Sequence, residues 1–164
     1  MSKNKIPQIA YRRKTEQKTN YKKRLALLKS RMPRVVVRKF NKNIVAQIIE
    51  YDETGDKVVA FAHSKELEKY GWKHSKNSVP ASYLLGILLS KKSKIKEAIL
   101  DTGLHSPTKG SRIFACVKGC IDGGMKIPQS EEAMPSPERL AGKHIQGKNL
   151  EKDVKDTKEK IIKG

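Results

Sequence analysis

The sequence predicts an α/β fold, a three-layer sandwich in which helices lie on both faces of a mixed sheet and a basic N-terminal arm precedes the domain. Three runs rich in β-branched residues, at 34–40, 44–51 and 57–63, are separated only by short polar turns. Strands joined by such turns pair antiparallel, so these runs predict a meander. A fourth strand at 97–101 follows a helix, and a right-handed crossover would make it parallel to a neighbour.

Helical periodicity supports the other two layers. After Asn20, a typical cap, Tyr21, Leu25 and Leu28 recur on one side of a short basic helix that ends before Pro33, and this apolar side needs a core to lie on. Later helices are predicted from caps, helix-breaking glycines and apolar stripes at 64–70, from 77 or 78 to 92, from 112 to 122 and from 137 to about 145.

Positive charge is concentrated near the N-terminus. The 164 residues include 36 Lys and Arg against 17 Asp and Glu, a net charge of +19, and residues 1–43 hold 15 of these cations against one acid, a net charge of +14. Residues 1–19 contain few apolar side chains, so we expect an arm that becomes ordered on a partner. The predicted organisation is a basic arm at 1–19, one α/β domain at 20–146 and a charged flexible tail at 147–164, too polar to dock.

Composition argues against membrane and secreted classes. The longest nearly unbroken apolar run, 83–89, is far shorter than the roughly 20 residues that cross a bilayer. The first 14 residues lack the apolar stretch of a secretory signal. With only Cys116 and Cys120 a disulfide framework is excluded, so we expect two packed thiols and a cytoplasmic protein without membrane contact.

Catalytic and metal sites find little support. Zinc needs about four ligands at short spacings, whereas the four histidines are scattered. The ribonuclease H-like topology predicted for the sheet suggests a metal-dependent nuclease as an alternative, with Asp52, Asp101 and Asp122 as candidate carboxylates. That chemistry needs a carboxylate on the first strand, where RVVVRKF carries Arg34 and Arg38 instead. We therefore expect no enzyme, no catalytic residue, no metal, no cofactor and no small-molecule substrate.

The basic segment points to a polyanionic partner. It lacks the acids at i+4 that would compensate a solvated basic face. Tyr11 precedes Arg12-Arg13-Lys14 and Tyr21 precedes Lys22-Lys23-Arg24, so stacking groups alternate with phosphate partners, as suits RNA with splayed bases. No recognition-helix pair, zinc finger or heptad for duplex DNA is present. A non-specific nucleic-acid binder remains a further alternative.

A second candidate for phosphate binding precedes the helix predicted at 112–122. Lys109, Ser111 and Arg112 flank its start, where exposed N–H groups attract anions. The spacing matches no P-loop or dinucleotide motif, and a simple capped loop is the alternative.

Six blocks between Tyr11 and about Ile145 resemble one family in their order and spacing: EQKTNYKKRLALLKSR, RVVVRKFNKNIVAQI, KELEKYGWK, NSVPASYLLGILLSKK, ILDTGL and TKGSRIFACVKGCIDGGMKIP. The chain resembles the large-subunit ribosomal protein that holds 5S rRNA, the eighteenth in the bacterial naming, in its archaeal and eukaryotic form. The resemblance implies a non-catalytic protein of the cytoplasmic large ribosomal subunit that helps attach 5S rRNA to the large-subunit rRNA. Its implied partners are 5S rRNA, large-subunit rRNA and neighbouring ribosomal proteins.

The resemblance also implies which residues contact RNA. Carried over by position, they are Arg12, Arg13, Lys14, Lys18, Thr19, Asn20, Tyr21 and Arg24 of the arm and helix, and Arg34, Arg38, Asn41, Asn43 and Gln47 of the hairpin. The residue patterns themselves add Tyr11, Lys23, Arg31, Lys109, Ser111 and Arg112. Gln17 stands where the family commonly has glycine, and Asn20 where it commonly has aspartate.

Overall fold

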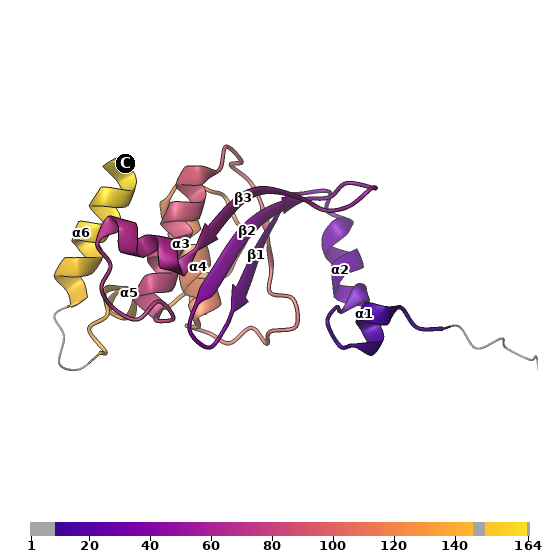
Figure 1. The fold of residues 1–164 in the computed structure, drawn as a ribbon, viewed down its shortest axis with the longest axis horizontal. Helices are drawn as coiled ribbons and strands as arrows, with labels where there is room; N and C mark the ends of the chain where they lie inside the picture. The colour runs from indigo at the N-terminus through magenta and orange to yellow at the C-terminus, as the bar shows by residue number, and fades with distance from the viewer. Residues whose placement is uncertain (1–8, 146–149, 164) are drawn as a thin grey trace, which may run out of the picture.

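A computed structural model describes residues 9–145 and 150–163, and within them four strands form one mixed sheet in the order β3-β2-β1-β4 (Figure 1). β1 pairs antiparallel with β2, β2 antiparallel with β3, and β4 parallel to β1. The predicted meander, the parallel strand and the ribonuclease H-like strand order are therefore confirmed. The strands are β1 (Arg34–Lys39), β2 (Ile44–Glu50), β3 (Lys57–His63) and β4 (Ile99–Asp101).

One face of the sheet packs against the hydrophobic core. Alternation along β1 and β2 places Val35, Val37, Ala46 and Ile48 on this inner face, where all four are fully buried. The register sets Val37 opposite Ala46. The outer face carries Arg34, Val36, Arg38, Gln47 and Phe61, the mixture of basic and apolar side chains that the alternation predicts.

Helices α3 (Val79–Lys92) and α4 (Arg112–Asp122) cover the inner face (Figure 1). Ser78 caps α3 by accepting the Ala81 N–H, and the 3-10 helix η1 (Ser64–Tyr70) packs beside it. The two helices touch through their backbones, because a Cβ added at Gly119 would lie 2.0 Å from the carbonyl oxygen of Tyr83 on α3. These elements confirm the helices predicted for the core.

β3 forms one edge of the sheet. Its Val58, Val59 and Phe61 side chains are largely exposed. Lys92, at the end of α3, donates its ammonium to the Phe61 carbonyl and pairs with Glu66. The β2–β3 register is also interrupted between Ile48 and Ile49. The edge is thus apolar in composition but irregular and flanked by charge.

On the opposite side of the sheet lies α2 (Tyr21–Leu28), capped by the Asn20 carboxamide, which accepts the Lys23 N–H at 3.0 Å. No residue of α2 is buried, and Leu25 is 59% exposed. The expectation that its apolar side rests on a core is therefore wrong. The helix is attached by polar contacts instead, which leaves that side open to a partner.

The arm is more structured than its composition predicts, since residues 12–15 form one helical turn, α1 (Arg12–Thr15). The Tyr11 carbonyl accepts the N–H groups of Lys14 and Thr15. The Tyr11 ring lies 5.0 Å from that of Tyr21, which ties the turn to α2. The part of the predicted arm at residues 1–8 lies outside the described residues.

The prediction of a flexible tail at 147–164 is wrong for residues 150–163. Residues 150–163 form α6 (Leu150–Lys163), which packs on α3 through a buried stripe of Leu150, Val154, Thr157 and Ile161. The Lys91 ammonium donates to the carbonyls of Ile161 and Ile162, and Lys158 donates to the Tyr83 hydroxyl at 3.0 Å. A stripe with one buried side chain per turn, three of the four apolar, and hydrogen bonds from a neighbouring helix suffice to dock a helix of low mean hydropathy. Residues 147–149 lie outside the described residues.

The remaining elements are short. η2 (Glu131–Ala133) and α5 (Pro137–Ala141) connect α4 to the C-terminal region, and α5 begins at the predicted Ser136-Pro137. Cys116 and Cys120 are free and buried on α4, which confirms two packed thiols. Their mutual hydrogen bond, together with burial, raises the pKa of Cys120. Among the described helices none has the length and apolarity to span a membrane.

Candidate nucleic-acid interface

Side chains from α1, α2 and the outer face of β1 line a hollow. In Figure 1, α1 and α2 lie at the end of the molecule opposite α6. Six of the fourteen residues that line the hollow are cations, and its acidic members are Asp56, which precedes β3, and Asp101, at the end of β4. The structure thus brings together predicted site residues that are far apart in the sequence. They are Arg13, Lys18, Thr19, Asn20, Lys23, Arg24, Arg34 and Arg38.

Arg34 is the inner member of an ion-pair network. Its side chain is only 2% exposed, and its guanidinium reaches Asp56 Oδ2 at 2.7 Å and Asp101 Oδ2 at 3.1 Å. Arg24 on α2 binds the same Asp56 carboxylate in bidentate fashion, at 2.8 and 2.9 Å. This bond from Arg24 lowers the pKa of Asp56 against the opposing effect of burial, so Asp56 stays ionised at neutral pH. Arg34, predicted as an RNA contact on an exposed face, is instead inside the protein.

Lys23 and Arg38 are also engaged with the protein. The Lys23 ammonium donates to Thr102 Oγ1 at 2.5 Å and to the Gly103 carbonyl at 3.2 Å. Arg38 Nη1 donates to the carbonyls of Val37 and Asp101 at 3.0 and 2.9 Å. The Arg38 side chain remains 33% exposed, so it can still present part of its guanidinium to a ligand.

The outer wall of this hollow is solvent-facing. Arg12 and Lys18 pair with Glu16, but their side chains are 85% and 62% exposed. Arg13 Nε donates to Thr19 Oγ1 at 2.9 Å, and Lys14 makes no ion pair within the described part of the chain. Tyr11 is exposed beside Tyr21. Cations and aromatic rings are therefore available together on this side.

Two exposed residues, one in the arm and one after α2, have a left-handed backbone. Gln17, with φ of 51°, ends the α1 turn, and Arg31, with φ of 55°, follows α2. Glycine adopts this conformation without strain, whereas other residues are disfavoured there. The backbone at Gln17 would therefore accept glycine without strain.

The turn between β1 and β2 holds a separate group of predicted residues. Asn41 is exposed and its carbonyl accepts the Asn77 side-chain amide at 2.7 Å. Asn43 is half-buried beside it, and Gln47 is half-buried on the outer face of β2. The hydrogen bond between Asn77 and Asn41 places this turn near the start of α3, away from the arm.

A second hollow lies where α3 and α4 begin. Lys39, Asn77, Ser111, Arg112 and other residues line it. Arg112 donates to the Asn77 carbonyl at 3.1 Å. Ser111 is the N-cap of α4, as predicted, but its hydroxyl makes no capping bond, and its Oγ and Asn77 Oδ1 are buried without a hydrogen-bond partner among the described residues.

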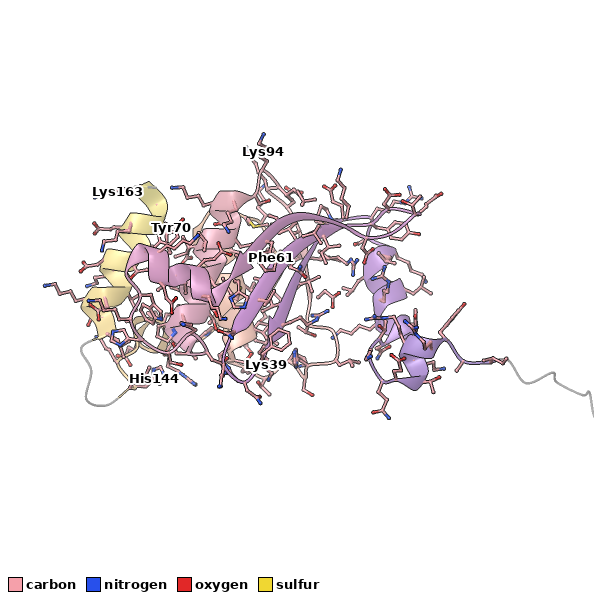
Figure 2. All side chains as sticks on the ribbon, in the orientation of Figure 1. Lys39, Phe61, Tyr70, Lys94, His144 and Lys163 are labelled. Carbon is pink, nitrogen blue, oxygen red and sulfur yellow. The ribbon has the colours of Figure 1, made fainter. Side chains whose placement is uncertain are left out.

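Sequence reasoning missed part of this second hollow. Arg139 and His144 also line it, although no local pattern around them signals a site. Lys39 was recognisable as a cation at the end of the first strand. Lys109 pairs instead with Glu132 and is not among the lining residues. Figure 2 shows Lys39 and His144 on the same lower side of the molecule.

His105 lies close to cations from both hollows. Burial lowers its pKa, and so do the positive charges of Lys39, Arg38 and Arg112. Arg38 lines the first hollow, whereas Lys39 and Arg112 line the second. We call the surface from Arg13 through Arg38 and Lys39 to Arg112 the basic track.

The carboxylates considered for a nuclease are dispersed. Asp101 binds Arg34, Asp122 accepts the Tyr83 hydroxyl at 2.8 Å, and exposed Asp52 accepts the Thr54 N–H. In residues 9–145 and 150–163 no cluster of three His, Cys, Asp or Glu side chains could hold a metal ion. The geometry therefore gives the nuclease alternative no support.

Comparison with known proteins gives one consistent result. The sequence profile of the family described as ribosomal large subunit proteins 60S L5, and 50S L18 matches residues 5–97 and 90–130. The chain is also similar to the large ribosomal subunit protein uL18 of Korarchaeum cryptofilum (strain OPF8). The two are 51% identical over 140 residues, which are 84% of this chain and 72% of that protein.

Proposed function

We propose that this chain, which belongs to the large-subunit ribosomal protein family of 60S L5 and 50S L18, binds 5S rRNA and helps attach it to the large-subunit rRNA. As a member of that family it is a structural protein of the large ribosomal subunit and not an enzyme. The observation that carries this proposal is the arm, where exposed Arg12, Lys14 and Lys18 stand beside exposed Tyr11. Cations neutralise phosphates, and tyrosine rings stack on unpaired bases.

The basic track would extend this contact across the domain. Phosphates bound at the arm and at the start of α4 would lie along one surface, with Arg38 and Lys39 between them. The Ser111 hydroxyl, which has no hydrogen-bond partner among the described residues, and the N–H groups of the first turn of α4 suit a phosphate oxygen. A protein that touches RNA at both ends of such a track is suited to join two RNA segments.

Fewer residues are proposed to contact RNA than the sequence alone suggests. Arg34 is buried, and Arg24 and Lys23 are engaged with Asp56, Thr102 and Gly103. The remaining predicted residues keep their proposed role as RNA contacts: Tyr11, Arg12, Arg13, Lys14, Lys18, Thr19, Asn20, Tyr21, Arg31, Arg38, Asn41, Asn43, Gln47, Lys109, Ser111 and Arg112.

The test of this function is the RNA that the protein selects. The full chain, purified from its own cells under nuclease-free conditions, is expected to carry one small discrete RNA with the sequence of 5S rRNA. In binding assays it should prefer 5S rRNA to tRNA and to duplex DNA of equal length. A heterogeneous mixture of RNA and DNA would instead support the non-specific nucleic-acid binder.

Arg38 is expected to contribute more to recognition than a cation on α6. Two carbonyls hold its guanidinium on the sheet, so little side-chain entropy is lost on binding RNA. Arg38→Ala should weaken 5S rRNA binding by about 1–3 kcal/mol and reduce the preference over tRNA. Lys163, at the far end of the molecule in Figure 2, is a control of equal charge whose removal should be nearly silent. Equal losses would indicate binding by diffuse charge.

Lys158 is a poor control for this comparison, although the sequence places it among solvated charges. Its ammonium donates to the Tyr83 hydroxyl and lies 5.5 Å from the centre of that ring. Replacing it would disturb the contact between α6 and α3. Lys163 is exposed, and within the described residues it forms an ion pair only with Glu159, at 3.7 Å.

A further inference from the structure

We propose that Asp56 is a positioning residue, which holds the basic helix α2 against the sheet so that the arm is oriented before RNA arrives. Resting on the proposed function, this predicts that removing the negative charge of Asp56 weakens RNA binding although it makes the protein more basic. Asp56 would thus support the binding of a polyanion through an acidic group that the RNA does not touch.

The first argument is that α2 has little else to hold it. None of its residues is fully buried, and Leu27 and Leu28 are only half-buried, so apolar packing contributes little to its place on the domain. Isolated helices of about eight residues are marginal in water because their first turn is costly to form. The described contacts of its side chains with the domain are polar: Arg24 with Asp56, and Lys23 with Thr102 and Gly103.

The second argument is that Asp56 connects α2 to the paired strands of the sheet. Its carboxylate accepts two bonds from Arg24 and one from Arg34. Arg34 is buried on β1 and is fixed in turn by Asp101, whose other oxygen accepts the Gly103 N–H at 2.7 Å. The connection therefore runs from α2 through Asp56 to two paired strands of the sheet.

The third argument concerns the sign of the charge. An acidic group in the wall of a basic hollow repels phosphate and lowers the affinity for RNA if its only effect is electrostatic. Here the carboxylate turns two guanidinium groups toward the protein. If the arm is already ordered, less conformational entropy is lost when RNA binds, so the affinity for RNA is higher. The two effects have opposite signs, so a single substitution separates them.

The experiment compares Asp56→Asn with Glu53→Gln in the full chain. Both acids lie in the segment between β2 and β3, and each change replaces a carboxylate with an amide and raises the net charge by one. Glu53 is exposed and makes no ion pair among the described residues. We expect Asp56→Asn to weaken binding of 5S rRNA by about tenfold, whereas Glu53→Gln leaves it unchanged or slightly tighter. Binding by Asp56→Asn as tight as by Glu53→Gln would overturn the proposal.

A second readout follows α2 without RNA. Amide hydrogen exchange across residues 24–28 should be faster in Asp56→Asn than in the wild type and unchanged in Glu53→Gln. Because Asp56 also pairs with buried Arg34, the unfolding temperature of the domain should fall as well, so exchange across α2 is compared with exchange across β1. Asp56→Glu, which keeps the charge, should recover part of the affinity. Unchanged exchange in Asp56→Asn would refute the positioning role. If the wild type fails to bind 5S rRNA, the proposed function fails, and the exchange data still decide whether Asp56 holds α2.

Discussion

Deletion of residues 1–19 is expected to leave a folded domain whose affinity for 5S rRNA falls by about 100-fold or more. Each hydrogen bond to a charged group contributes about 1.5–3 kcal/mol, so losing two of them gives an effect of this size. The described part of this segment contains no buried residue, so the core should unfold cooperatively as before. Fluorescence anisotropy with labelled 5S rRNA and thermal unfolding measure the two quantities.

A triple variant removes positive charge from the arm without deleting the arm itself. With Arg12, Arg13 and Lys14 replaced by Ala, the slope of log affinity against log salt should become shallower by about 0.7–0.9 for each phosphate that the protein no longer neutralises. An unchanged slope would show that these side chains do not touch phosphate. An unfolded deletion protein would show that the arm belongs to the core.

Gly119→Ala is expected to lower the free energy of unfolding by about 3 kcal/mol or more, the upper range for overpacking a core. The added Cβ would lie 2.0 Å from the Tyr83 carbonyl oxygen and 3.1 Å from the Gly86 Cα. Both are backbone atoms of α3, so no side-chain rotation relieves the clash and the helices must separate. Urea denaturation followed by the fluorescence of buried Trp72 gives the measurement.

The control for this variant is Lys118→Ala, which changes the neighbouring residue on the same helix. Lys118 forms a surface pair with Asp122 at 3.1 Å, and such pairs contribute little. Its loss should alter stability by no more than about 0.5 kcal/mol. If Gly119→Ala were equally mild, the close approach of α3 and α4 would not be a constraint on the fold.

Local patterns were sufficient to predict most of the fold. β3 spans the predicted residues 57–63, and Ser78, Pro80 and Gly123 stand at the helix ends where their chemistry suggests. α6 was missed although its buried residues, three apolar and one threonine, recur at intervals of four, three and four. Its docking depends on the matching surface of α3 and on Lys91, and neither is visible within residues 150–163.

The sequence predicts where the cations of the candidate site are concentrated. It does not predict which of them face the solvent and which are buried. The concentration of cations identified the arm, and the alternation in β1 placed Arg34 on the outer face. That Arg34 is buried depends on Asp56 and Asp101, which are 22 and 67 residues away. Local periodicity carries no information about pairs at such separations, so an inward-facing cation could not be distinguished from an RNA contact.

The edge of the sheet at β3 bears on how the protein behaves before it joins a ribosome. An edge strand with exposed Val58, Val59 and Phe61 offers a template on which further chains can add and aggregate. The Lys92 ammonium donates a hydrogen bond to the Phe61 carbonyl. The register shift between Ile48 and Ile49 interrupts the pairing of β2 with β3. Charge and irregularity at an edge both oppose such addition. Newly made copies are therefore protected from self-association at this edge during the interval between synthesis and assembly.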